Sequence, residues 1–298
     1  MNKGIGYAAV AYISWAFLPI YWKSLDSVPA LEIVGHRIIW SFGLVLAILI
    51  IRNDWKHYQD IVQSPKILII YLVTASLLGI NWLTFVWAIN AGFIVESSLG
   101  YFINPLVNVL LGVIFLREKL RYMQWMPIGI ALIGVLYLSV SYGSLPWIAL
   151  TLAFSFGLYG LIKKTAPLSS FDGFALETGI MFLPALSYLL YLRSMNRGFF
   201  LDQSTSTSIL LFFAGLVTGI PLLLFGAGAR RIRLSTLGLL QYITPTGHFF
   251  VGILIYGEDF SHEKLIGFGI IWFALAIYSL EGIINRRQNN IILNTAAN

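Results

Sequence analysis

The stretch LGYFINP at residues 99–105 returns as LLQYITP at residues 239–245, almost half the chain later. The correspondence runs without a gap over residues 73–139 and 213–279, at a constant offset of 140 in a chain of 298 residues. Its matched pairs include Gly79 and Gly219, Leu83 and Leu223, Phe85 and Phe225, Pro105 and Pro245, Gly112 and Gly252, Glu118 and Glu258, and Gly129 and Gly269. The sequence therefore predicts an internal duplication.

The composition is that of a membrane protein. Hydrophobic residues make up 58% of the chain and charged residues only 11%, whereas a soluble domain carries about 25% charged residues. Apolar runs of about 20 residues have the length that a helix needs to cross a bilayer. The sequence predicts an all-α membrane protein with ten transmembrane helices, at residues 4–22, 30–51, 67–88, 97–116, 122–140, 146–162, 173–192, 208–229, 234–256 and 265–283.

The duplication and the span count together predict the symmetry. Five spans fall in each half, and because five is odd, the second half must start on the side where the first half ends. We therefore expect two inverted five-helix repeats at residues 1–141 and 142–284, followed by a polar cytoplasmic tail at residues 285–298. Inverted repeats build many alternating-access transporters, which bind substrate near the midplane between the repeats.

The charge distribution predicts orientation in the bilayer. With the N-terminus placed in the cytoplasm, fourteen Lys and Arg residues fall on the inner side and four on the outer side. Cytoplasmic loops of membrane proteins show this excess. We expect a multi-pass protein of the cytoplasmic (inner) membrane with both termini in the cytoplasm. The lipid bilayer thus accounts for the net charge of +6, and no nucleic-acid partner is expected.

Several classes of function lack their sequence signals. The chain has no cysteine, and its four histidines show no HxxxH or HExxH spacing, which are signs of metal sites. It also has no Walker-type GxxxxGK[ST] and no dinucleotide fingerprint. We expect no cofactor, no metal, no nucleotide and no enzymatic activity. The alternatives are a membrane-embedded enzyme, which would need an acid–base or metal cluster, and a sensor or scaffold, which would normally add a soluble signalling domain.

Two spans carry a polar stripe beside a proline. The stripes comprise Tyr101, Asn104 and Asn108 in the fourth span and Gln241, Thr244 and His248 in the ninth. Spacings of three and four residues place each set on one helix face, and Pro105 and Pro245 are expected to kink or open the helices. Such a stripe avoids lipid. It either forms a wall of a substrate cavity or supplies interhelical hydrogen bonds.

Two charged residues lie within spans at equivalent positions. Arg37 aligns with Glu177 at the offset of 140. A charge at the bilayer centre costs roughly 2.5–3.5 kcal/mol, so both should have a structural or functional role. They either form an ion pair or belong to a small-molecule substrate site or a proton site, and a proton is therefore a possible coupling ion.

Aromatic residues near these spans suggest further contacts with a solute. Trp15 and Trp82 could stack on a planar substrate or simply pack. Lys23 follows an aromatic pair at an outer helix end, which indicates a gate or vestibule residue, with interfacial snorkelling as the alternative.

Three other charged residues are expected to be structural or interfacial. Lys163 should snorkel to the interface, and Glu32 should reach interfacial water. Glu118, like its counterpart Glu258, precedes a span and should oppose the positive N-terminus of that helix.

Short motifs resemble a known family. LREKL at 116–120 and GEDF at 257–260 are similar to the repeat ends of the EamA repeats in the drug/metabolite transporter superfamily, and ALE at 30–32, HRIIWS at 36–41, NWLTFVWAIN at 81–90 and ALET at 175–178 resemble its RarD branch. The resemblance covers nearly the whole chain. It implies a secondary transporter, and we expect an exporter, of a small organic solute or drug with a central cavity between the repeats. RarD members are named for an association with chloramphenicol sensitivity, and other family members carry drugs, amino acids or nucleotide sugars.

Overall fold

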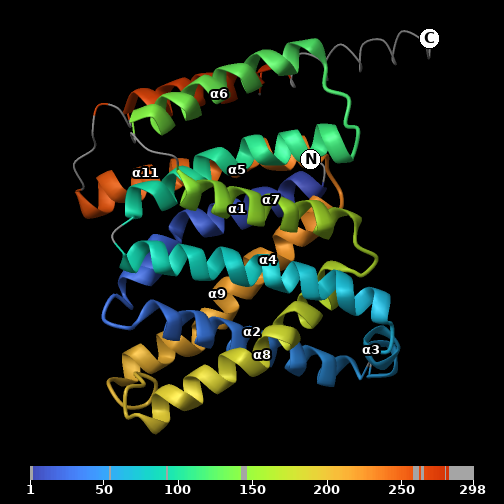
Figure 1. The fold of residues 1–298 in the computed structure, drawn as a ribbon, viewed down its shortest axis with the longest axis vertical. Coiled ribbons are helices and arrows are strands. Elements are labelled where there is room, and N and C mark those ends of the chain that lie inside the picture. The colour runs from blue at the N-terminus through green and yellow to red at the C-terminus, as the bar shows by residue number, and fades with distance from the viewer. Residues whose placement is uncertain are drawn as a thin grey trace.

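The computed structural model describes residues 3–53, 55–91, 93–141, 146–257, 262, 265–278, 280 and 281. Every regular element within these residues is a helix (Figure 1). The helices are α1 (Lys3–Lys23), α2 (Ala30–Arg52), α3 (Trp55–Val62), α4 (Pro65–Asn90), α5 (Ile94–Phe115), α6 (Tyr122–Ser141), α7 (Trp147–Thr165), α8 (Ser170–Ser194), α9 (Thr205–Ala229), α10 (Leu234–Gln241) and α11 (Ile243–Tyr256), followed by Leu265–Tyr278.

Eight spans in the described chain are long and apolar enough to cross a membrane. They lie in α1, α2, α4, α5, α6, α8 and α9, and in residues 234–256, which include both α10 and α11. The prediction of an all-helical membrane protein is confirmed. Helix α7 and the shorter helix Leu265–Tyr278 coincide with the sixth and tenth spans that the sequence predicts.

The core of the bundle lies between helices from the two halves of the chain. The most extensive contacts join α5 to α7 and α10, α2 to α8 and α9, α1 to α9 and α11, and α4 to α7. Each of these pairs joins a helix before residue 142 to one after residue 145. In Figure 1, α2 and α8 form one edge of the bundle and α6 forms the other. The fully buried side chains at the centre include Tyr12, Leu78, Tyr159, Phe225 and Leu237.

Close helix contacts depend on glycine. A Cβ built at Gly215 of α9 would meet the backbone carbon of Trp40 in α2 and lie 2.5 Å from the backbone nitrogen of Ser41. The Ser41 hydroxyl donates to the Gly215 carbonyl oxygen at 3.0 Å. Small residues let membrane helices approach at backbone distance, so α2 and α9 are held together at this point.

The two equivalent prolines have different effects. The helix is interrupted at Tyr242, three residues before Pro245, where the Tyr242 N–H bonds the Leu239 carbonyl at 3.3 Å. Proline lacks the N–H that would bond the carbonyl four residues earlier, which explains the interruption. Helix α5 continues without interruption through Pro105, so the expected opening of the helix is absent there.

Helix α3 lies between the second and third spans that the sequence predicts. Ile61 of α3 is buried and packs with Tyr71 and Leu176. Burial, together with the Asp172 carboxylate, raises the pKa of Tyr58 to about 12, so that phenol stays neutral. Because Ile61 packs with residues of α4 and α8, the short helix docks on these two helices, at the end of the bundle that carries the N-terminus (Figure 1). We call this end the basic end.

Candidate functional site

Arg37 is held by a hydroxyl and two aromatic rings. It lies seven residues into α2, and its Nε donates to Thr218 Oγ1 of α9 at 2.9 Å. The guanidinium carbon lies 4.4 Å from the ring centroid of Trp82 and 5.0 Å from that of Trp22. Cation–π contacts of this kind stabilise a desolvated cation by about 2 kcal/mol or more. They offset much of the cost of a charge within the membrane.

Tyr101 and His248 continue the same region toward α1. Their rings meet edge to face with centroids 5.7 Å apart, and His248 Nε2 lies 3.1 Å from the carbonyl oxygen of Trp15. We define the central aromatic cluster as Trp15, Trp22, Arg37, Trp82, Tyr101, Thr218 and His248. It draws on α1, α2, α4, α5, α9 and α11, and most of its side chains are only half-buried.

The remaining stripe residues form a buried hydrogen-bonded layer. Asn108 Nδ2 donates to Asn104 Oδ1 at 3.0 Å and to Gln241 Oε1 at 2.9 Å. Asn104 also donates to a backbone carbonyl of α7 at 2.8 Å, and Thr244 donates to a carbonyl of α1 at 3.1 Å. All four residues are at most 4% exposed. This geometry favours the packing interpretation for these four, and the cavity interpretation stays a prediction for Tyr101 and His248.

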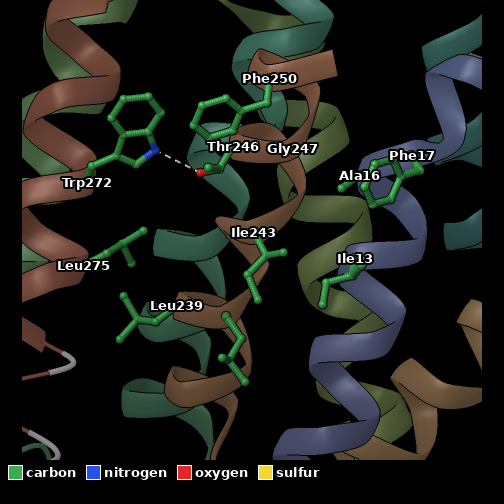
Figure 2. A pocket seen from close by; sticks show the side chains of 11 residues that line it. Ile13, Ala16, Phe17, Leu239, Ile243, Thr246, Gly247, Phe250, Trp272 and Leu275 are labelled. Carbon is green, nitrogen blue, oxygen red and sulfur yellow. Dashed lines mark hydrogen bonds between the residues drawn. The ribbon is translucent and has the colours of Figure 1, made fainter. Parts of the chain in front are cut away.

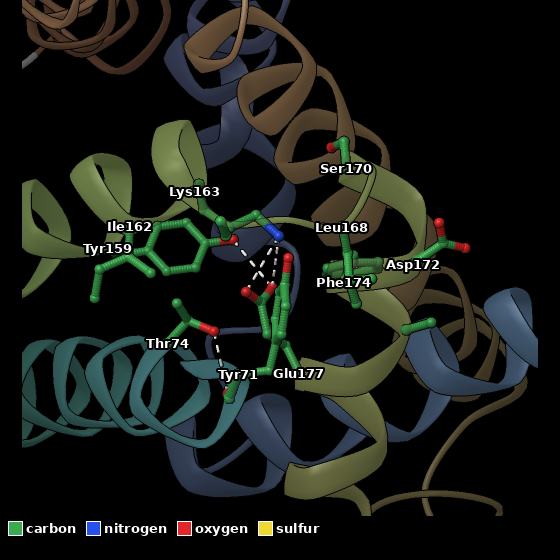
Figure 3. A network of polar contacts seen from close by, with 12 residues as sticks. Tyr71, Thr74, Tyr159, Ile162, Lys163, Leu168, Ser170, Asp172, Phe174 and Glu177 are labelled. Atoms are coloured by element: carbon green, nitrogen blue, oxygen red, sulfur yellow. Dashed lines mark hydrogen bonds and ion pairs between the residues drawn. The ribbon is translucent and has the colours of Figure 1, made fainter. Parts of the chain in front are cut away.

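Glu177 pairs with Lys163 (Figure 3). Lys163 Nζ lies 3.1 Å from one carboxylate oxygen and 3.2 Å from the other, and the Tyr159 hydroxyl donates to Glu177 Oε2 at 3.2 Å. The Lys163 and Glu177 side chains are only 3% and 0% exposed. The expectation that Lys163 snorkels is therefore wrong, because it points into the protein toward a buried carboxylate. The alternative in which Arg37 pairs with Glu177 is not the arrangement in this structure.

Further polar contacts link the helices at the basic end. Arg230 donates to carbonyls between α7 and α8 at 2.5 and 2.6 Å, and Lys164 donates to two carbonyls at and after the end of α9. The Glu118 carboxylate accepts from the backbone N–H groups of Leu234 and Ser235 at 2.6 and 3.0 Å. Glu118 thus faces a helix N-terminus as expected, but that of α10 instead of the following helix. Its counterpart Glu258 lies outside the described residues.

At the opposite end, two charged residues have contrasting environments. Lys23 is exposed and lies 3.7 Å above the ring of Tyr256, so it joins α1 to α11. Glu32 is 1% exposed, accepts from the Phe199 N–H at 2.7 Å and lies 3.8 Å from His36 Nε2. The expectation that Glu32 reaches interfacial water is wrong, because the segment between α8 and α9 covers it. The vestibule role of Lys23 remains a prediction.

A separate apolar groove of about 490 Å³ lies between α1, α11 and Leu265–Tyr278 (Figure 2). Its lining includes the exposed side chains of Phe17 and Phe250, and Trp272 Nε1 donates to Thr246 Oγ1 across it at 3.0 Å. None of the central aromatic cluster lines it. Its apolar, outward-facing walls suit lipid chains better than a polar solute.

Two members of the central aromatic cluster, Trp22 and Thr218, could not be predicted from the sequence. Trp22 follows a tyrosine and precedes Lys23, which is typical of an interfacial belt. Thr218 is an isolated hydroxyl in an apolar span, and its equivalent at the offset of 140 is Leu78. Neither position carries a polar pattern, so only the fold brings them to Arg37.

Comparison with known proteins identifies the family. The profile of the EamA-like transporter family matches residues 2–140. "Uncharacterized transporter YojE" of Bacillus subtilis is 44% identical over 286 residues, which cover 95% of each chain. "Protein RarD" of Escherichia coli K12 is 42% identical over 97% of this chain and 98% of its own. A crystal structure with 18% identity has the same fold, with a TM-score of 0.71 over 94% of this chain and 98% of the other.

The fold and these relatives define a multi-pass helical membrane transporter, not an enzyme. The chain belongs to the EamA-like transporter family and is a homologue of the RarD proteins.

Proposed function

We propose that this protein is a secondary transporter that exports a small organic solute across the cytoplasmic membrane by alternating access. The observation that carries the proposal is the central aromatic cluster, which draws side chains from both halves of the chain around an intramembrane arginine. Binding sites of transporters built from repeats lie near the midplane between the repeats. The cluster combines side chains from both halves of the chain, which supports its assignment as such a site.

The contacts between the cluster and the basic end support a conformation closed at that end. Asn104 and Asn108 lie three and seven residues beyond Tyr101, and Thr244 and Gln241 lie four and seven residues before His248. At about 1.5 Å per residue, this buried layer begins about 5–10 Å from the cluster in the direction of the basic end. The Lys163–Glu177 pair and the contacts of Arg230 and Glu118 lie further in that direction. A solute would therefore reach the cluster from the opposite end.

The finer architecture forms part of the same proposal. Ten spans are arranged as two inverted five-helix repeats at residues 1–141 and 142–284, with a cytoplasmic tail at 285–298. Support comes from the repeat at offset 140 and from α7 and Leu265–Tyr278, which fall where the sixth and tenth spans are predicted. The basic end then faces the cytoplasm, in agreement with the excess of Lys and Arg there.

Alkaline phosphatase fusions at two positions test this topology. Alkaline phosphatase is active only outside the cytoplasm, so a fusion after Asn298 should be inactive, whereas a fusion after Asp202, between α8 and α9, should be active. The measurement is phosphatase activity normalised to fusion protein level. An active fusion after Asn298 would mean that the span count is odd.

Introduced cysteines test which residues face the solute path. The chain has no cysteine of its own. Cysteine at the half-buried positions of Tyr101 and His248 should react with small hydrophilic thiol reagents, whereas cysteine at the buried positions of Asn108 and Gln241 should not. Labelling is measured by mass spectrometry in intact membranes. Labelling confined to Asn108 and Gln241 would contradict a solute path that contains Tyr101 and His248.

Flux in a purified system tests transport itself. Solutes are first screened by thermal stabilisation of the detergent-solubilised protein, because a ligand of the folded state raises apparent stability. Chloramphenicol belongs in this screen because one relative, 28% identical, is called "Chloramphenicol-sensitive protein RarD" in Pseudomonas aeruginosa. We expect saturable flux of a stabilising solute in proteoliposomes that contain only this protein. Binding without flux would favour a sensor or scaffold.

A further inference from the structure

We infer that the solute carries an oxyanion, such as a carboxylate or phosphate group, beside a planar ring, and that Arg37 binds the oxyanion. This inference rests on the proposed transport function and names the class of its substrate. It follows from the unused donors of Arg37, from the rings that surround it and from the lack of a carboxylate partner for Arg37 among the described residues.

Arg37 has hydrogen-bond donors to spare. Its Nε is used by Thr218 at 2.9 Å. Among the residues that the structure describes, no acceptor bonds the two terminal nitrogens, and no carboxylate lies within 4.0 Å of the guanidinium. Those nitrogens form the planar fork that binds carboxylate and phosphate groups bidentately. Thr218 therefore orients the group and leaves its anion-binding edge available.

Neither of the two buried carboxylates in the described spans bonds Arg37. Glu177 is bound by Lys163 and Tyr159. Glu32, on the same helix as Arg37, accepts from the Phe199 N–H and lies beside His36 through Oε1, whereas its Oε2 has no hydrogen-bond partner among the described residues. A cation at this depth without an anionic partner is costly, and a bound solute that brings its own negative charge would remove that cost.

The rings of the central aromatic cluster add the second part of the specificity. Trp82 and Trp22 lie against the guanidinium at 4.4 and 5.0 Å, and the ring of Tyr101 meets that of His248. Flat apolar faces favour contact with a planar ring, in offset-stacked or edge-to-face geometry. A solute with an oxyanion attached to a ring can contact Arg37 and these faces at the same time.

The test compares anions with neutral counterparts that keep the same ring. The probes are phenylacetate, indole-3-acetate and phenyl phosphate, with phenylacetamide, indole-3-acetamide and phenol as neutral counterparts. Binding to the full-length protein is measured by thermal shift and by titration in detergent. We expect each anion that binds to stabilise the protein while its neutral counterpart does not. Comparison of phenylacetate with phenyl phosphate then distinguishes carboxylate from phosphate recognition.

Variants assign the effect to Arg37. Arg37→Gln should raise the dissociation constant of a bound anion at least about tenfold, because a charge-assisted hydrogen bond is lost. Arg37→Lys, which keeps the charge but loses the fork, should recover part of the affinity. The matched control is Arg193→Gln, which removes an exposed arginine that pairs with Asp202; its dissociation constant should match the wild type.

Three outcomes would overturn the inference: equal binding of anions and neutral analogues, an unchanged dissociation constant in a folded Arg37→Gln protein, or no binding by any of the three anions. The transport proposal is judged separately. If a neutral or cationic solute shows saturable flux that Arg37→Gln leaves unchanged, transport stands and the anion assignment fails. If no solute shows flux although anions bind at Arg37, the assignment stands and transport fails.

Discussion

Replacing Lys163 by methionine is expected to destabilise the folded protein by about 3–5 kcal/mol, because it leaves the Glu177 carboxylate buried without its cationic partner. The two side chains are 3% and 0% exposed, and the charged atoms lie 3.1 Å apart. Folded domains have only about 5–15 kcal/mol of stability. The variant should therefore accumulate poorly in the membrane and unfold at a much lower temperature than the wild type. The measurement is denaturant or thermal unfolding in detergent, together with protein level in the membrane.

Two further variants separate an ion-pair effect from a packing effect. Replacing both Lys163 and Glu177 by methionine should recover most of the stability, since a buried pair can be exchanged for apolar residues at little net cost. Arg193→Met breaks an ion pair of similar length, 3.2 Å, whose side chains are 60% and 50% exposed. Exposed pairs contribute about 0–1 kcal/mol, so this control should be almost neutral. If the double variant were no more stable than Lys163→Met, the loss would not arise from an unpaired charge.

Gly215→Ala is expected to destabilise the protein by about 1–3 kcal/mol or more, the typical cost of overpacking. The added methyl group would meet the backbone of α2 at Trp40 and Ser41. A flexible side chain can adopt another rotamer to make room, but the backbone of a helix cannot. The two helices must separate, which also disturbs the contact between Arg37 and Thr218 that they share. The unfolding midpoint and solute affinity should therefore both fall.

Gly79→Ala is the matched control in α4. A Cβ at Gly79 has no neighbour within 4 Å, and alanine favours a helix by about 1 kcal/mol over glycine. This variant should be as stable as the wild type or slightly more stable. Equal behaviour of the two alanine variants would show that α2 and α9 are not closely packed at Gly215.

The sequence predicts the helical membrane class well because that class depends on composition and on the length of apolar runs. It predicts partners poorly. Alignment of the two halves paired Arg37 with Glu177 by equivalence, but contact depends on the fold, and Glu177 instead meets Lys163 across the short connection between α7 and α8. The apolar runs of the sequence do not predict helix α3, because its eight residues are too few to form an apolar span.

The polar stripes show the same limit at the level of a single helix face. A spacing of three and four residues establishes that Tyr101, Asn104 and Asn108 share a face. It cannot tell which neighbour that face meets along its length. Asn104 and Asn108 pack against α7 and α10, whereas Tyr101 is half-buried beside His248. The packing interpretation thus fits the stripe at Asn104 and Asn108, and the cavity interpretation stays a prediction for Tyr101.

The unequal effects of Pro105 and Pro245 bear on the energetics of the whole cycle. If two identical halves were inverted in a membrane, the states open to either side would be degenerate, related by symmetry and equally populated. Here an uninterrupted helix in one half corresponds to an interrupted one in the other. In the proposed alternating-access cycle, that difference would lift the degeneracy, because the same displacement bends different backbones. The protein would then have a preferred resting side even at zero gradient, and the solute would supply part of the free energy needed to leave it.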